Sequence, residues 1–320
     1  MHDIEFREAV RNGSLEDVEK ALRKGADINC VDSAHRSALH DAIICRKSKE
    51  SKEVFEFLIE NNADINARDI RGKTPLHFAA EYSELEMALA LLHSGANIDT
   101  CDNIQHNALH WASIGGDVDI IAAIMAKGAN VDMTNINGNT ALHLASKGSN
   151  AAAVDFFIKQ KVNIESANNN GNRPLHKASF EADGQTIEIL LNANANIEAK
   201  NNNGNTPLHR ASHTGNMEAM IELLKRRASI HAKNNDGATP LHRAVATHMN
   251  SAAKLLLQIG ANLKVKDNFG HTPIDLASSF VMKTILIQAL ENRHKYLMEE
   301  ERQRMLSGIV SSIARKEEVA

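Results

Sequence analysis

The 320-residue sequence has few cysteines and no long apolar run. Its three cysteines, Cys30, Cys45 and Cys101, are odd in number and lack the spacing of a metal site, so we expect free thiols in a reducing compartment. No apolar stretch approaches the ~18 residues that a membrane span requires, and the first residues lack the basic and apolar regions of a signal peptide. These absences predict an intracellular, cytoplasmic protein without a membrane span.

Aromatic residues and excess charge are also scarce. The chain has one Trp and two Tyr, which suits a core of thin helical layers filled by Ala, Leu and Ile. Its net charge of −4 provides no overall attraction to nucleic acid, so nucleic acid is not an expected partner.

Motifs of catalysis are missing as well. The sequence contains no His-Glu-x-x-His, Gly-x-Ser-x-Gly or Cys-x-x-Cys. Residues 72–74, Gly-Lys-Thr, imitate the end of a phosphate loop, but Ala67 stands where that loop requires glycine. We therefore expect no catalytic site, no metal and no cofactor, with an enzyme that uses an unrecognised site as the rival class.

What the sequence does contain is a repeat. Residues 204–211 read Gly-Asn-Thr-Pro-Leu-His-Arg-Ala, and close variants begin at 171 and at 237. The spacing of the units is 33 residues, except that the first gap is 37. The positions equivalent to Thr206 are Ser37, Thr74, Asn107, Thr140, Arg173, Thr206, Thr239 and Thr272.

The pattern Thr-Pro-Leu-His-x-Ala at this period resembles the ankyrin repeat family over residues 4–292. The resemblance implies an all-α solenoid of helix-turn-helix pairs with β-turn fingers. It places a repeat array at 1–292 and a helical extension and tail at 293–320, with the last helix running beyond the last repeat. The nine units start near residues 4, 37, 74, 107, 140, 173, 206, 239 and 272.

Two units depart from the pattern. In the first, Arg7 stands at the histidine position, and with Glu5, Glu8 and Arg11 it predicts the solvated face of an end repeat. In the second, four extra residues fall within 46–53, as a solvated loop or as a basic docking loop.

Two turn positions are also unusual. His35 and Gln105 replace the glycine that other units carry two residues before the Thr position. If these positions need a positive φ, their turns are strained or of another type.

Seven histidines recur in phase. Successive packed helices lie ~8–10 Å apart, which is too far for two imidazoles to share a zinc ion. The resemblance implies instead that each histidine bonds turn backbone and the Thr hydroxyl between repeats. These structural residues are His40, His77, His110, His143, His176, His209 and His242.

A second stripe on each first helix follows the histidine at i, i+3, i+4 spacing. The resemblance implies that this stripe and the finger tips line a concave groove that binds partners. Its apolar part in units three and four, tips included, is Ile70, Phe78, Tyr82, Ile104, Trp111 and Ile114. Its basic part in units six to eight, turn edges included, is Lys177, Lys200, Arg210, His213, Lys233 and Arg243. Phe78 and Trp111 have an alternative role in packing against neighbouring first helices.

We conclude that the sequence predicts a non-enzymatic scaffold or adaptor, monomeric alone, that binds another protein in this groove. A bacterial effector of the ankyrin type acting in a host cytosol is one alternative. A binder of nucleic acid or an anionic ligand through the basic part is another.

Overall fold

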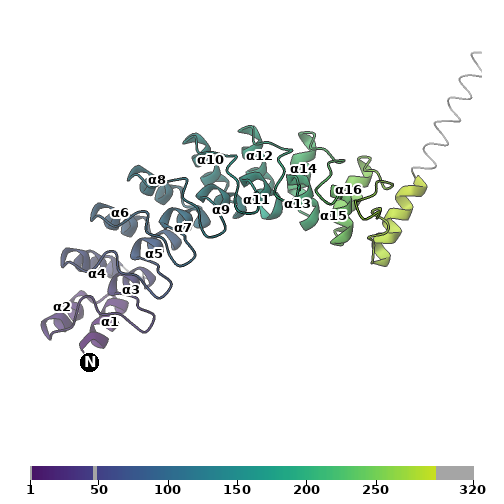
Figure 1. Cartoon of the computed structure of the whole chain (residues 1–320). Helices are drawn as coiled ribbons and strands as arrows, with labels where there is room; N and C mark the ends of the chain where they lie inside the picture. The colour runs from purple at the N-terminus through teal and green to yellow at the C-terminus, as the bar shows by residue number, and fades with distance from the viewer. Residues whose placement is uncertain (1, 46–48, 293–320) are drawn as a thin grey trace, which may run out of the picture. The chain divides into compact units, whose positions relative to one another are not determined.

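The computed structural model describes residues 2–45 and 49–292, and within these ranges the chain consists of helices joined by turns, without strands. The chain divides into two compact units, Met1–Asn202 and Asn203–Ala320, which we call the N-terminal and C-terminal bodies. Figure 1 shows the helices as labelled below. The all-α architecture predicted by the repeat is confirmed.

In the N-terminal body, the first helices of the repeats stand in one row and the second helices in another (Figure 1). The first helices are α1 (His2–Asn12), α3 (Ala38–Ile44), α5 (Pro75–Glu81), α7 (Ala108–Gly115), α9 (Ala141–Lys147) and α11 (Pro174–Glu181). The second helices are α2 (Leu15–Arg23), α4 (Lys49–Glu60), α6 (Leu85–His93), α8 (Val118–Ala126), α10 (Ala151–Lys159) and α12 (Gly184–Asn192).

The C-terminal body continues the pattern. Its helices are α13 (Pro207–Thr214), α14 (Met217–Lys225), α15 (Pro240–Ala246) and α16 (Asn250–Gln258), followed by a helix over 280–292. The ninth repeat lacks a regular first helix, because residues 273–276 form only turns. The predicted continuation of the last helix beyond 292, and the tail, lie outside the described residues.

The core follows the repeat. The motif Leu and the Ala three residues later are buried in each first helix, as Leu142 and Ala145 illustrate with no exposed surface. Apolar residues of the second helices close the layer, among them Leu91, Ile124 and Leu190, all fully buried. Small residues keep neighbouring first helices close, which brings the turns between repeats into a regular row.

The extra residues of the second repeat are not simply a loop. Helix α4 begins at Lys49 and has 12 residues, whereas α6 has 9. The prediction of a loop over 46–53 is therefore wrong from residue 49 onward. Residues 46–48 lie outside the described residues.

Candidate functional site

Motif histidines join neighbouring repeats. The backbone N–H of Thr140 donates to Nδ1 of His143 over 3.2 Å, and Nε2 of His143 bonds the carbonyl of Asn172, just before the cap of the next repeat's first helix, over 2.9 Å. Because Nδ1 accepts a hydrogen bond, the ring is neutral and Nε2 carries the proton. His40, His77, His110, His209 and His242 make the same pair of contacts, and Nδ1 of His176 accepts from Arg173.

Burial keeps these rings neutral. It lowers the pKa of His40, His77, His110 and His143 to about 4. The histidines are thus structural joints, and none of them is available to a ligand. Among the described residues there is no group of three or more His, Cys, Asp or Glu side chains that could hold a metal ion.

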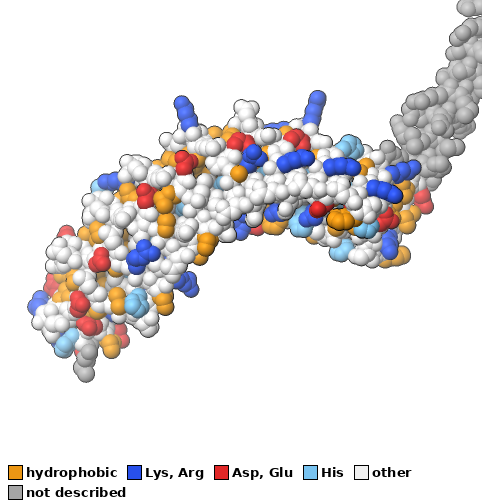
Figure 2. Space-filling view, in the orientation of Figure 1, with side chains coloured by type: hydrophobic (Ala, Val, Ile, Leu, Met, Phe, Trp, Pro, Cys, Tyr) orange, Lys and Arg blue, Asp and Glu red, His pale blue; other side chains and the backbone are white. Residues whose placement is uncertain are grey.

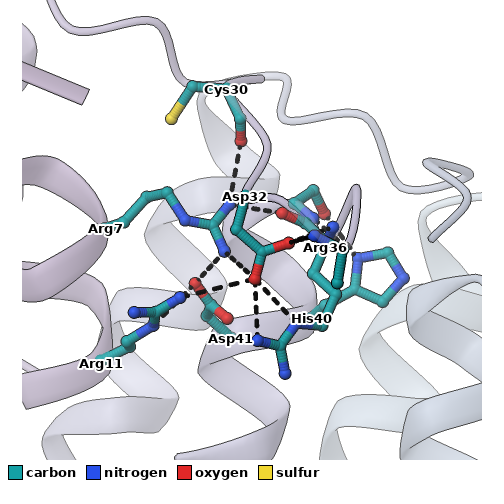
Figure 3. Close-up of polar contacts among 9 residues, drawn as sticks. Arg7, Arg11, Cys30, Asp32, Arg36, His40 and Asp41 are labelled. Carbon is teal, nitrogen blue, oxygen red and sulfur yellow. Dashed lines mark hydrogen bonds and ion pairs between the residues drawn. The ribbon is translucent and has the colours of Figure 1, made fainter. Parts of the chain in front are cut away.

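Arg7 takes the place of the histidine in the first repeat. Its guanidinium donates to the carbonyls of Arg36 and Cys30 and pairs with the carboxylates of Asp41 and Asp32 (Figure 3). The Arg7 side chain is buried, with 7% exposed, so the prediction that it lies on a solvated face is wrong. The reason is that Asp41 of the next repeat and Asp32 of the turn leading into that repeat neutralise it.

The two carboxylates differ. Burial opposes ionisation of Asp32, but hydrogen bonds from the backbone and guanidinium of Arg36 and from the Ala34 N–H outweigh it and lower its pKa to about 2. Burial raises the pKa of Asp41, and the charges of Arg7 and Arg11 act in the opposite direction. This cluster joins the first repeat to the second.

The fingers are the turns between repeats, and each begins with an Asp or Asn that folds the turn. In the finger that starts at Asn135, the side-chain oxygen accepts from the backbone N–H groups of Asn137 and Asn139, at 2.9 and 3.0 Å. A backbone bond links each described finger of the N-terminal body to the previous one, for example Ile136 N–H to the Ile104 carbonyl over 3.2 Å. The fingers therefore form a ladder.

A second contact locks most neighbouring fingers together. The Asn169 side chain donates to the Ile136 carbonyl over 3.0 Å, and its oxygen lies 2.3 Å from where a Cβ on Gly138 would stand. Only glycine fits beneath this asparagine, and Gly138 also has a φ of 73°. The same pairing of Gly with Asn occurs at Gly72–Asn103 and Gly171–Asn202 in the N-terminal body, and at Gly204–Asn235 and Gly237–Asn268 in the C-terminal body.

Two finger pairs lack this lock. His35 and Gln105 occupy the glycine position and still have positive φ values, 57° and 59°. The residues that face them are Ile70 and Ile136, where the locked pairs have asparagine. These two fingers thus keep the same turn type. Each carries the strain of a non-glycine residue at positive φ, and each also lacks the asparagine that faces the locked glycines.

An inner cluster engages the predicted aromatic anchors. Nζ of Lys73 lies 3.4 Å from the Trp111 ring centroid and 5.7 Å from that of Phe78, and it pairs with Glu81 over 2.7 Å. The Trp111 ring N–H donates to Asp102 over 3.0 Å. Phe78 is only 7% exposed, and Trp111 is half-buried. Phe78 therefore packs within the body, whereas Trp111 is held by Lys73 and Asp102 and keeps part of its surface exposed.

The apolar surface lies beside this cluster. On the first helices, Tyr82 is 36% and Ile114 is 41% exposed. On the finger tips, Ile70, Ile104 and Ile136 are 64%, 46% and 56% exposed. Sequence reasoning found four of these five side chains and missed Ile136, although Ile136 occupies the same finger position as Ile70.

The basic residues divide between the two bodies. Lys177 and Lys200 belong to the N-terminal body, where Lys177 is half-buried and Lys200 is exposed. In the C-terminal body, Nη2 of Arg243 lies 3.2 Å from Nδ1 of His213. Burial and the charges of Arg243 and Arg210 lower the pKa of His213, so its ring accepts from Arg243.

Lys233 is exposed, and its Nζ donates to the Lys266 carbonyl over 3.4 Å. Lys and Arg side chains gather on the visible face over α14 and α16 (Figure 2). The C-terminal body therefore carries a basic face of its own.

Comparison with known proteins identifies the family. A model of ankyrin repeats in three copies matches residues 6–102, 109–201 and 182–267, so the chain belongs to the ankyrin repeat family. This family consists of protein-interaction domains and is generally non-catalytic. Within the described residues, no helix is both long and apolar enough to cross a membrane.

Three similar proteins illustrate the match. An ankyrin repeat protein of Rickettsia felis is 37% identical over 90 residues, 28% of this chain and 23% of that protein. Mouse protein phosphatase 1 regulatory subunit 27 is 30% identical over 95 residues, 29% of this chain and 59% of that protein. The crystal structure of the human ASB11 ankyrin repeat domain has 29% identity and a TM-score of 0.61, over 68% of this chain and 98% of that one.

Proposed function

We propose that this chain is a non-enzymatic scaffold or adaptor that binds a partner protein along the first helices and finger tips of its repeats. The observation that carries the proposal is the exposed apolar set of Tyr82, Ile114, Ile70 and Ile104 in a member of a family of interaction domains. Side chains buried against one another within the N-terminal body need no partner, but these four remain in contact with water. Clustered exposed apolar residues are typical of protein-binding surfaces.

The apolar and the basic candidate residues suit different tasks. Tyrosine and arginine are common at the energetic centres of interfaces. Tyr82 and Ile114 supply apolar contact in the N-terminal body. Arg210 and Arg243 are half-buried in the C-terminal body, where they attract acidic groups and favour rapid association with an acidic partner.

A direct test begins with affinity purification of the full chain and mass spectrometry of bound proteins. The purified partner is then measured against Tyr82→Ser with Ile114→Ser, which we expect to raise the dissociation rate at least tenfold. Ile221→Ser on α14 is the matched control, because Ile221 is 42% exposed on a second helix. Equal dissociation rates for all three folded proteins would move the site away from the first helices.

A binder of nucleic acid or an anionic ligand is the second candidate, supported by the half-buried Arg210 and Arg243 and the exposed Lys233 in the C-terminal body. Its test is the salt dependence of binding to DNA, RNA and phosphoinositide vesicles. A steep loss of binding with salt, abolished by Arg210→Glu with Arg243→Glu, would favour this candidate over a protein partner.

The likeness to the Rickettsia felis protein supports one further alternative, a bacterial effector that acts on a host protein. Its test is export from the bacterium that encodes the chain, before and after deletion of residues 302–320. A eukaryotic gene would end this alternative.

A further inference from the structure

The two unlocked finger pairs lack interactions that stabilise the locked pairs. In the locked pairs, Asn169 or its equivalent donates to the previous finger and excludes any side chain at the glycine below it. The pairs His35–Ile70 and Gln105–Ile136 give up this hydrogen bond and place non-glycine residues at φ values of 57° and 59°. Local departures from a repeated, stabilising rule concentrate where function requires them.

What the unlocked pairs gain is exposed apolar surface. Ile70 and Ile136 stand at the tips in place of asparagine, and Ile104 lies between them in the ladder. Backbone bonds from Asn103 N–H to the Arg71 carbonyl and from Ile136 N–H to the Ile104 carbonyl hold the three fingers in one row. Hydrophobic side chains protrude along the finger edge of the N-terminal body (Figure 2).

The charge on this row is of one sign. Arg71 is exposed beside Ile70, and its guanidinium has no hydrogen-bond or ion-pair partner among the described residues. The acidic residues of these fingers, Asp69 and Asp102, are buried, and each accepts backbone hydrogen bonds within its own turn. A partner on this row therefore meets apolar side chains and the cation of Arg71, with the exposed Arg68 guanidinium beside Gly72 in the same finger. The buried Asp69 and Asp102 offer it no exposed carboxylate.

We propose that the finger tips Ile70, Arg71, Ile104 and Ile136 bind a protein segment that carries apolar side chains and at least one Asp or Glu. The apolar side chains of the segment cover the three isoleucines, and its carboxylate pairs with Arg71. This inference rests on the proposed function, since it names the class of partner and moves the main apolar contact from Trp111 and Phe78 to the finger tips.

The test restores the lock and removes two of the three isoleucines, Ile70 and Ile136, in one step. The variant Gln105→Gly with Ile136→Asn copies the Gly138–Asn169 pair, and His35→Gly with Ile70→Asn does the same two repeats earlier. The combined fourfold variant is expected to melt at a higher temperature than the parent. A purely structural role of the isoleucines predicts the opposite, so a lower melting temperature would overturn the proposal.

Binding is measured with a display library of random 12-residue peptides presented to the parent and to the fourfold variant. Peptides retained only by the parent are expected to combine Leu, Ile, Val or Phe with Asp or Glu. A selected peptide is then titrated by fluorescence anisotropy, and the fourfold variant and Arg71→Glu should each weaken it at least tenfold. Arg227→Glu, on the turn after α14, is the matched charge control and should change little.

Several results would overturn the proposal. The parent could retain no peptides, retain the same peptides as the fourfold variant, or select basic ones. These failures differ from failure of the proposed function. If a purified protein partner binds the parent and the fourfold variant equally, the finger-tip site is wrong while the interaction function stands.

Discussion

Arg7 in the first repeat and His143 in the fifth occupy the same position and bond the carbonyl just before the next helix cap, of Arg36 and Asn172 respectively. His143 does so as a neutral ring, completed by Thr140 of its own repeat. Arg7 does so as a cation, balanced by Asp41 of the second repeat and by Asp32 of the turn between the two repeats. The comparison shows that both repeats keep a hydrogen bond to this carbonyl. The group that donates it, a neutral ring or a cation, depends on the side chains that surround it.

A fall in pH should affect the stability of the histidine joints and of the Arg7 joint differently. We expect it to cause the largest loss of unfolding free energy. The pKa of His40, His77, His110 and His143 is lowered to about 4, below the ~6.5 of an unfolded histidine. The neutral form is therefore favoured by folding, and this stability is complete above about pH 6.5 and is lost as pH falls toward 4. Each histidine contributes on the order of 3 kcal/mol over that range.

The measurement is urea unfolding followed by the fluorescence of Trp111, the single Trp, at a series of pH values. The midpoint should fall steeply between pH 6.5 and 4. In the Arg7 joint, Asp32, with a pKa of about 2, stays ionised across this range, whereas burial raises the pKa of Asp41. A midpoint that does not change between pH 7 and pH 4.5 would contradict the neutral, buried state of the rings.

Removal of the charged joint comes next in size. Arg7→Met leaves Asp41 buried without its main partner, which should cost ~3–5 kcal/mol of unfolding free energy. Adding Asp41→Leu should recover most of that loss, because no unpaired charge then remains. Arg11→Met is the control, since the Arg11 side chain is 40% exposed and its loss should cost less. Similar losses for Arg7→Met and Arg11→Met would show that burial of the pair does not set its importance.

Much of this structure could be predicted from the sequence, because each repeat contacts only its neighbours and the motif fixes local geometry. The cap at Thr140 and the joint at His143 follow from the pattern, whereas the sequence left two turn types open at His35, of which the structure has the one with positive φ. Other features depend on two departures that meet across repeats. Arg7 pairs with Asp41, and Ile136 faces Gln105, so a residue examined alone gives no sign of either contact.

The candidate surface was predicted only in part for the same reason. Phe78 and Trp111 stand at stripe positions that the helical period places toward solvent. Lys73, from the finger that precedes Phe78, covers both rings and turns them into packed side chains. The period gives the direction of a side chain but not what lies above it.

Lys73 allows the stability contribution of a buried cation to be compared with that of a surface cation. Lys73→Met keeps the carbon stem but removes the charge above Trp111, which should cost about 2 kcal/mol and shift the fluorescence emission of Trp111. Lys147→Met is the control, because Lys147 pairs with Glu181 at 3.3 Å on the surface and contributes at most ~1 kcal/mol. An unchanged emission spectrum in Lys73→Met would place the ammonium away from the ring.

The smallest effect concerns the comparison between locked and unlocked fingers. Gln105→Gly alone should stabilise the protein by ~0.5–1 kcal/mol. Glycine adopts a φ of 59° without the left-handed penalty, and the greater conformational entropy of glycine in the unfolded chain offsets part of this gain. The reverse change, Gly138→Gln, should destabilise by more than that. There a Cβ would lie 2.3 Å from the Asn169 side-chain oxygen, so the asparagine must move and give up its bond to the Ile136 carbonyl. Thermal unfolding of the two variants measures both signs. If Gln105→Gly stabilised the protein but Gly138→Gln did not destabilise it, the asparagine would not determine which fingers require glycine.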